Sequence, residues 1–151
     1  MSTRILLIED EPLLVSLYTM VLLQAAYEVN SATDEETAEL KLISERPHVI
    51  LLDLLIPKSA GGDMHAESLH EPTGFQILRL VKGTPSLQDM RVIVLSNLDS
   101  DEHMRIANEL GADRYLIKAN IDPHDLKKNV EEVLHGIQAS AKPIKVKVKK
   151  G

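Results

Sequence analysis

Five side chains that could together handle a phosphoryl group each follow a short apolar run in this 151-residue sequence: Glu9, Asp10, Asp53, Ser96 and Lys118. Three carboxylates brought into one crevice repel one another unless a cation lies among them. A lysine ammonium and a serine hydroxyl beside them can hold an oxyanion. If the fold brings these residues together, they form a phosphoryl site that contains a hard divalent cation.

The residue types also suggest a role for each acid. Mg²⁺ takes a few oxygen ligands and keeps several waters, which fits Asp10 and Asp53 as direct ligands and Glu9 as a ligand through water. Asp53 is the predicted nucleophile, because a carboxylate at the end of a central strand can attack a phosphoryl group and form an aspartyl phosphate. Lys118 would share with the metal the neutralisation of the transferring group.

The elements that must position these residues are short buried strands alternating with amphipathic helices. This alternation predicts an α/β fold, a doubly wound five-stranded parallel sheet of flavodoxin-like topology with strand order 2-1-3-4-5 and helices on both faces. Such sheets bind ligands at the carboxyl ends of their strands, where all five residues are expected. Thr33 and Glu36 have the spacing of a capping box for the second helix. The strands are expected at 5–8, 27–32, 49–52, 91–95 and 114–117, and the helices at 12–25, 33–46, from about 74, at 101–110 and at 122–138.

Composition and charge exclude several kinds of chemistry. The chain has no Cys, which removes disulfides, thiolate metal sites and cysteine nucleophiles. Residues 1–141 carry a net charge of −11 and the last ten residues carry +5, so the acidic body would repel nucleic acid. No stretch has the pattern of a membrane span or a signal peptide. We therefore expect a cytoplasmic protein that contacts neither membrane nor nucleic acid.

Two segments depart from the strand and helix pattern. We expect one domain over residues 1–138, with an insertion at about 58–72 after the third strand, and a disordered basic tail at 139–151. His65 and His70 in the insertion do not have the spacing of a familiar metal-binding pair. Because so few residues follow the last predicted helix, the sequence favours a stand-alone domain, although a fragment of a longer protein would look the same.

Over about residues 4–138 the sequence resembles the receiver domain of two-component response regulators. The resemblance implies that Asp53 accepts a phosphoryl group from a histidine kinase or a phosphotransfer protein, with Mg²⁺ as cofactor. The motifs that carry it are Glu9-Asp10-Glu11 after the first strand, Asp53 with Pro57 four residues later, Ser96 after the fourth strand, and Tyr115 with Lys118 around the fifth.

The same resemblance implies further roles. The backbone carbonyl of Leu55 would join Glu9, Asp10 and Asp53 around the metal. Ser96 would hydrogen-bond the phosphoryl oxygen while Tyr115 swings inward, which changes the face used for a downstream protein partner. Such a protein is a signalling switch and not an enzyme; its output partner, and whether it forms a homodimer, stay open.

Three positions depart from the family pattern, and one of them, Glu9 in place of the more usual Asp, is a common and tolerated variant. Asn97 stands where Ala or Gly is usual, and its larger side chain is expected to modulate access to Asp53 or the lifetime of the aspartyl phosphate. Ala119 stands where a proline in a cis bond usually follows Lys118, so this loop must be shaped differently. Together with the insertion at about 58–72, Asn97 and Ala119 lend support to one alternative, a receiver-like scaffold that binds partners without phosphorylation. An aspartate-nucleophile phosphohydrolase is disfavoured, because Leu55 stands where that class needs a second acid.

Overall fold

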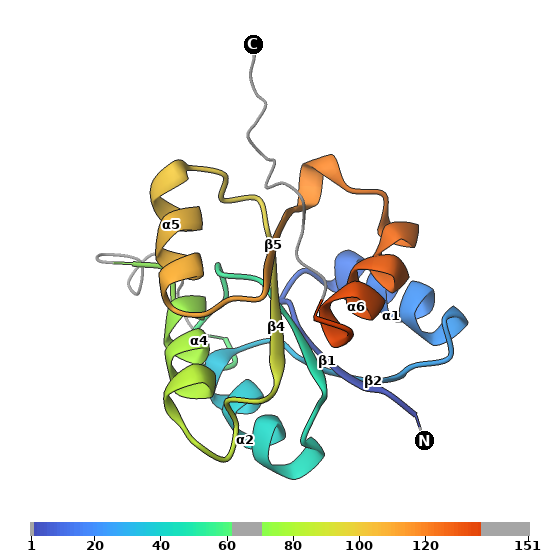
Figure 1. The fold of residues 1–151 in the computed structure, drawn as a ribbon, viewed down its shortest axis with the longest axis horizontal. Helices are drawn as coiled ribbons and strands as arrows, with labels where there is room; N and C mark the ends of the chain where they lie inside the picture. Colours follow the sequence, from blue (N-terminus) through green and yellow to red (C-terminus); the bar gives the residue numbers. More distant parts are fainter. Residues whose placement is uncertain (1, 62–70, 137–151) are drawn as a thin grey trace.

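The computed structural model describes residues 2–61 and 71–136, and these form one parallel five-stranded sheet covered by helices (Figure 1). The strand order is β2-β1-β3-β4-β5, which confirms the predicted doubly wound topology. Register pairs such as Ile8 with Ala32 and Ile8 with Leu52 bring the carboxyl ends of adjacent strands level with one another. The strands are β1 Arg4–Ile8, β2 Glu28–Ala32, β3 Val49–Leu52, β4 Arg91–Ser96 and β5 Arg114–Ile117.

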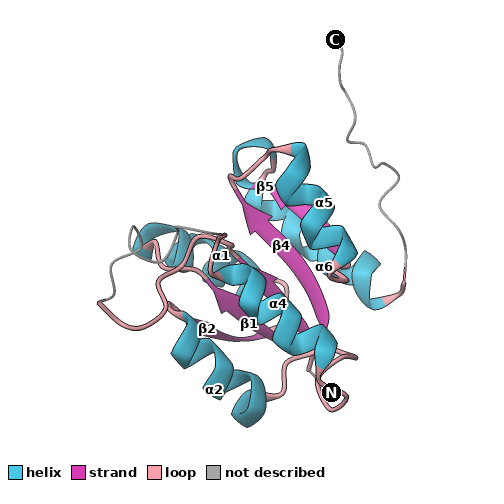
Figure 2. Ribbon diagram, turned by 90° about the vertical axis from the view of Figure 1, so that its left-hand side faces the viewer, coloured by secondary structure: helices cyan, strands magenta, loops and turns pink. Residues whose placement is uncertain are grey.

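Helices cover both faces of the sheet, as Figures 1 and 2 show. The unbroken apolar run of β1 follows from this arrangement: Leu6 and Ile8 pack in one core cluster while Ile5 and Leu7 pack in the other. One layer contains α1 Pro12–Gln24 and α6 Leu126–Leu134; the other contains α2 Glu35–Glu45, α4 Gly74–Gly83 and α5 Asp101–Glu109.

Two helix starts differ from the sequence prediction. The N-cap of α2 is Asp34 and not Thr33, because the buried Asp34 carboxylate accepts a hydrogen bond from the Thr37 amide at 2.8 Å. The last helix, expected as one piece from Asp122, is divided into a 3₁₀ turn at Pro123–Asp125 and then α6. Its expected end at Gln138 lies outside the described residues.

The connection between β3 and α4 is fixed to the body of the protein at both ends. The carbonyls of Pro57 and Lys58 accept hydrogen bonds from the first two amides of α2, each at 3.0 Å. At the other end, Glu71 pairs with Arg79 of α4. Residues 62–70 of the predicted insertion, with both of its histidines, and the predicted tail lie outside the described residues.

None of the helices within 2–61 and 71–136 is long and apolar enough to cross a membrane.

Candidate phosphoryl and metal site

The three predicted acids stand where β1 and β3 end, and backbone hydrogen bonds fix two of them, Glu9 and Asp53, to the sheet. The Glu9 amide donates to the Ala32 carbonyl and the Asp53 amide to the Ile8 carbonyl, each at 3.0 Å. Each bond extends the parallel ladder by one residue beyond the last strand pair. The acids are therefore held by the sheet, which is the most rigid part of the fold.

The side chains of these acids converge. Glu9, Asp10 and Asp53 each offer a carboxylate oxygen, and these oxygens all lie within 4.8 Å of one another. Glu9 and Asp53 are buried, with exposed fractions of 1% and 6%, whereas Asp10 is half-buried. The predicted meeting of acids from distant parts of the chain is thus confirmed.

Lys118, directly after β5, completes the cluster from the other side. Its Nζ lies 2.6 Å from Glu9 Oε1 and 2.8 Å from Asp53 Oδ2. Three carboxylates and one ammonium leave a net charge of −2. The donor set consists of hard oxygen ligands with a charge that one divalent cation would neutralise, so these residues fit Mg²⁺ or a similar ion.

The pKa shifts within the cluster also indicate a site that favours a cation. Burial raises the pKa of Glu9, and the Asp53 charge adds to that rise while Lys118 opposes it. Burial and then the charge of Asp53 raise the pKa of Asp10. Burial alone would lower the pKa of Lys118, but its contacts with Asp53 and Glu9 more than offset this and the pKa rises. The three carboxylates thus carry more negative charge than the Lys118 ammonium balances.

The loop after β3 orients the Asp53 carboxylate. The Leu55 amide donates to Asp53 Oδ1 at 3.1 Å, so one carboxylate oxygen faces the loop and the other faces Lys118. Leu55 is therefore next to the cluster, where its carbonyl was expected; coordination by that carbonyl stays a prediction.

The two remaining family positions, Ser96 and Tyr115, are linked through Leu98. Buried Ser96 accepts a hydrogen bond from the Leu98 amide on its Oγ at 3.3 Å, and the Tyr115 hydroxyl donates to the Leu98 carbonyl at 2.5 Å. Burial, followed by the charges of Asp53 and Asp99, raises the pKa of Tyr115, so its hydroxyl stays protonated and can donate. One residue of the loop after β4 thus contacts both side chains.

Sequence reasoning missed a glycine that shapes the site. Gly74, the first residue of α4, packs so closely on the chain after β3 that a Cβ atom there would lie 2.6 Å from Leu54 Cα and 2.8 Å from the Asp53 carbonyl oxygen. Its amide donates to the Leu54 carbonyl at 2.9 Å. The only signal in the sequence was a glycine at a helix start, which does not reveal what it touches.

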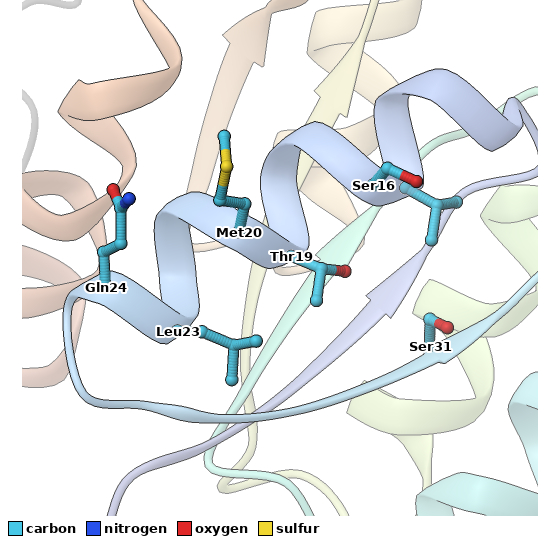
Figure 3. Close-up of a pocket in the computed structure, with 7 residues that line it drawn as sticks. Ser16, Thr19, Met20, Leu23, Gln24 and Ser31 are labelled. Carbon is cyan, nitrogen blue, oxygen red and sulfur yellow. The ribbon is translucent and has the colours of Figure 1, made fainter.

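A shallow groove of about 680 Å³ lies elsewhere, along α1 and the edge strand β2 (Figure 3). Within the part of the chain that the structure describes, no charged side chain and none of the predicted site residues lines this groove. The groove is thus separate from the acidic cluster. Its lining residues are Val15, Ser16, Thr19, Met20, Leu23, Gln24 and Ser31.

Comparison with known proteins places this site in a family. The family model described as "Response regulator receiver domain" matches residues 5–131, so the chain belongs to the response regulator receiver domains, as its motifs predicted. The matched region contains every residue of the cluster and both of the linked residues, Ser96 and Tyr115.

Individual relatives agree with this assignment. The chain is 28% identical over 141 residues to the alkaline phosphatase synthesis transcriptional regulatory protein PhoP of Bacillus subtilis, covering 93% of this chain and 52% of PhoP. It is also 28% identical over 130 residues to the gliding motility regulatory protein of Myxococcus xanthus, covering 86% of this chain and 15% of that protein. The chain thus spans about half the length, or less, of these relatives.

Solved structures show the same fold. A CheY-like receiver domain protein from Methanospirillum hungatei superimposes with a TM-score of 0.72 at 24% identity, covering 89% of this chain and 95% of that one. The Mn²⁺-bound form of the response regulator Rcp1 superimposes with a TM-score of 0.69 at 26% identity, covering 86% and 92%.

Proposed function

We propose that this chain is a phosphorylation-dependent switch in which Asp53 accepts a phosphoryl group with the help of Mg²⁺. The observation that carries the proposal is the position of Asp53, which shares one cluster with two further acids and one ammonium at the carboxyl ends of the strands. The existence of a Mn²⁺-bound form of the similar response regulator Rcp1 supports a divalent cation as the ligand.

The chain's own groups support the transfer as follows. A carboxylate oxygen of Asp53 forms a bond to phosphorus while the P–N bond of a donor phosphohistidine breaks and its imidazole leaves with the bonding electron pair. The Leu55 amide keeps the carboxylate oriented, and the Lys118 ammonium offsets charge on the incoming group. Glu9, Asp10 and Asp53 would hold Mg²⁺, which when bound neutralises phosphoryl oxygens.

The switch would be read out through the loop after β4. The Ser96 hydroxyl accepts from the Leu98 amide and would donate its own proton to a phosphoryl oxygen on Asp53. Movement of Ser96 toward that oxygen would reach Leu98, and through the Leu98 carbonyl it would reach Tyr115. Phosphorylation would then shift the population toward a second packing of this loop and its neighbours. The protein would signal through a partner that prefers this packing, and would not act as an enzyme on a separate substrate.

A histidine kinase or a phosphotransfer protein is the expected donor, which implies a cytoplasmic location. The PhoP relative carries the name of a transcriptional regulator. The expectation that this chain itself does not bind nucleic acid stays a prediction, as does its oligomeric state.

The test is intact-mass spectrometry after incubation with acetyl phosphate, with and without Mg²⁺. We expect one phosphoryl adduct on the wild-type protein that requires Mg²⁺. Asp53→Ala should abolish the adduct, whereas the control Asp89→Asn, which changes an exposed acid outside the cluster, should leave it unchanged.

Absence of the phosphoryl adduct would count against the proposal. If no adduct forms at any time point and beryllofluoride, a phosphoryl mimic, fails to bind in the presence of Mg²⁺, then the phosphorylation proposal is wrong. The scaffold alternative would take its place.

A further inference from the structure

The ladder between β4 and β5 ends beside the phosphoryl site with the pair Ser96 and Ile117. The chain then turns into a 3₁₀ helix, Lys118–Asn120. The first amides of such a helix have no partner within it, and the residue before it, Ile117, has no side-chain acceptor that could cap it. Any partner for these amides must come from another part of the fold.

Asn97 supplies that partner from the neighbouring strand end. Its Oδ1 accepts a hydrogen bond from the Ala119 amide at 2.9 Å. Asn97 directly follows Ser96, and Ala119 directly follows Lys118, so this bond joins the two chain segments that carry the phosphoryl-binding groups. Asn97 and Ala119, which both differ from the residues usual in receiver domains, are thus in contact with each other.

We propose that Asn97 is a positioning residue, which holds the Lys118 ammonium between Glu9 and Asp53 by fixing the Ala119 amide. The Ala119 nitrogen belongs to the peptide unit that begins at Lys118, so fixing it restricts the backbone rotation next to the Lys118 side chain. That side chain is only 10% exposed and contacts two carboxylates, so a small rotation would disturb both contacts.

This role differs from obstruction of the site by bulk. An obstructing side chain acts through its size, whereas a positioning side chain acts through its acceptor oxygen and requires the amide opposite it. Removing the amide should therefore remove the effect of Asn97. Ala119→Pro does this, because proline has no backbone N–H.

The experiment is a double-mutant cycle of Asn97→Ala and Ala119→Pro. The first readout is amide hydrogen exchange at Ala119, followed by NMR on ¹⁵N-labelled protein. The second is the rate of Asp53 phosphorylation by acetyl phosphate at saturating Mg²⁺; this second readout rests on the proposed function. Two further variants are Asn97→Asp, which keeps an acceptor oxygen, and Asn120→Ala, which removes an exposed side chain from the same turn.

Asn97→Ala should speed Ala119 exchange and slow phosphorylation, each about fivefold, the size expected for one neutral hydrogen bond. Asn97→Asp should restore slow exchange, and Asn120→Ala should leave both readouts unchanged. In the Ala119→Pro background, Asn97→Ala should have no further effect on the phosphorylation rate.

Unchanged exchange at Ala119 in Asn97→Ala would overturn the proposal, and so would equal slowing of phosphorylation in both backgrounds. If the wild-type protein takes no phosphoryl group at all, the proposed function fails, and the exchange measurement with its Asn97→Asp rescue still decides whether Asn97 holds this turn.

Discussion

At the scale of single residues, the site contains more negative charge than its one lysine can balance. Lys118 contacts Glu9 and Asp53, whereas Asp10 forms no ion pair with any of the residues that the structure describes. Asp10 is also the most exposed of the three acids and is therefore the one most open to solvent. The excess charge that favours a divalent cation should destabilise the metal-free fold.

The pKa of Asp10 is raised by burial and by the Asp53 charge, so the native state binds its proton more readily than the unfolded state does. Stability from this group therefore falls as the pH rises through the window above an ordinary carboxyl pKa. We expect Asp10→Asn to stabilise the metal-free protein at pH 7 by about 1 kcal/mol, after allowing for solvent screening.

Urea denaturation in EDTA measures this difference. The stability gap between Asp10→Asn and the wild type should close as the pH falls toward about 4, near the ordinary carboxyl pKa, where protonation of Asp10 removes the charge difference. With Mg²⁺ at pH 7 the wild type should gain stability and Asp10→Asn much less. A gap that does not change with pH would show that charge crowding is not its cause.

At the scale of elements, the start of α4 is built against the end of β3. Gly74 leaves no room for a side chain over the backbone of Asp53 and Leu54. This contact therefore restricts the backbone position of Asp53 and Leu54, where the chain leaves β3. Packing between two backbones, and not a side-chain interaction, therefore fixes the backbone at Asp53.

Gly74→Ala should destabilise the protein by about 1–3 kcal/mol, the cost of forcing a methyl group into filled space. It should also slow phosphorylation of Asp53, because the backbone next to this residue must shift. Thermal denaturation and the acetyl phosphate assay measure the two effects.

Gly83, at the other end of α4, provides the matched control. A Cβ atom there would meet nothing within 4 Å, so Gly83→Ala should change neither property much. Equal effects of the two substitutions would mean that the glycines matter for helix formation alone.

Most of the elements could be predicted because every strand except β2 is a short apolar run with a polar residue at its end. Parallel strands place such ends on one edge, so Glu9, Asp53 and Lys118 could be grouped from the sequence alone. The contact of Asn97 with Ala119 could not be predicted, because it depends on the register in which β4 and β5 end. Gly74 was missed because nothing local shows that α4 returns to Leu54.

At the scale of the whole molecule, the site joins segments that lie more than a hundred residues apart in sequence. The loops after β1, β3 and β5 meet in the cluster formed by Glu9, Asp10, Asp53 and Lys118. A cation bound by the acids should therefore tie the loops after β1 and β3 together while leaving the opposite edge of the sheet unchanged.

Hydrogen exchange with mass spectrometry tests this expectation. Adding Mg²⁺ should slow exchange in peptides that contain residues 9–11 and 53–55, and should leave peptides from the amino-terminal ends of the strands unchanged. Asp10→Asn should lose most of this protection. Equal slowing of hydrogen exchange in all peptides would instead indicate a general gain in the stability of the fold.

The connection between β3 and α4 also bears on how the chain can change in length. Because Pro57, Lys58 and Glu71 are fixed to helices, the number of residues between them is not coupled to the position of Asp53. A change in the number of residues here should therefore leave the position of Asp53 unchanged, and a fluorescent reporter peptide inserted between residues 61 and 71 would test this expectation.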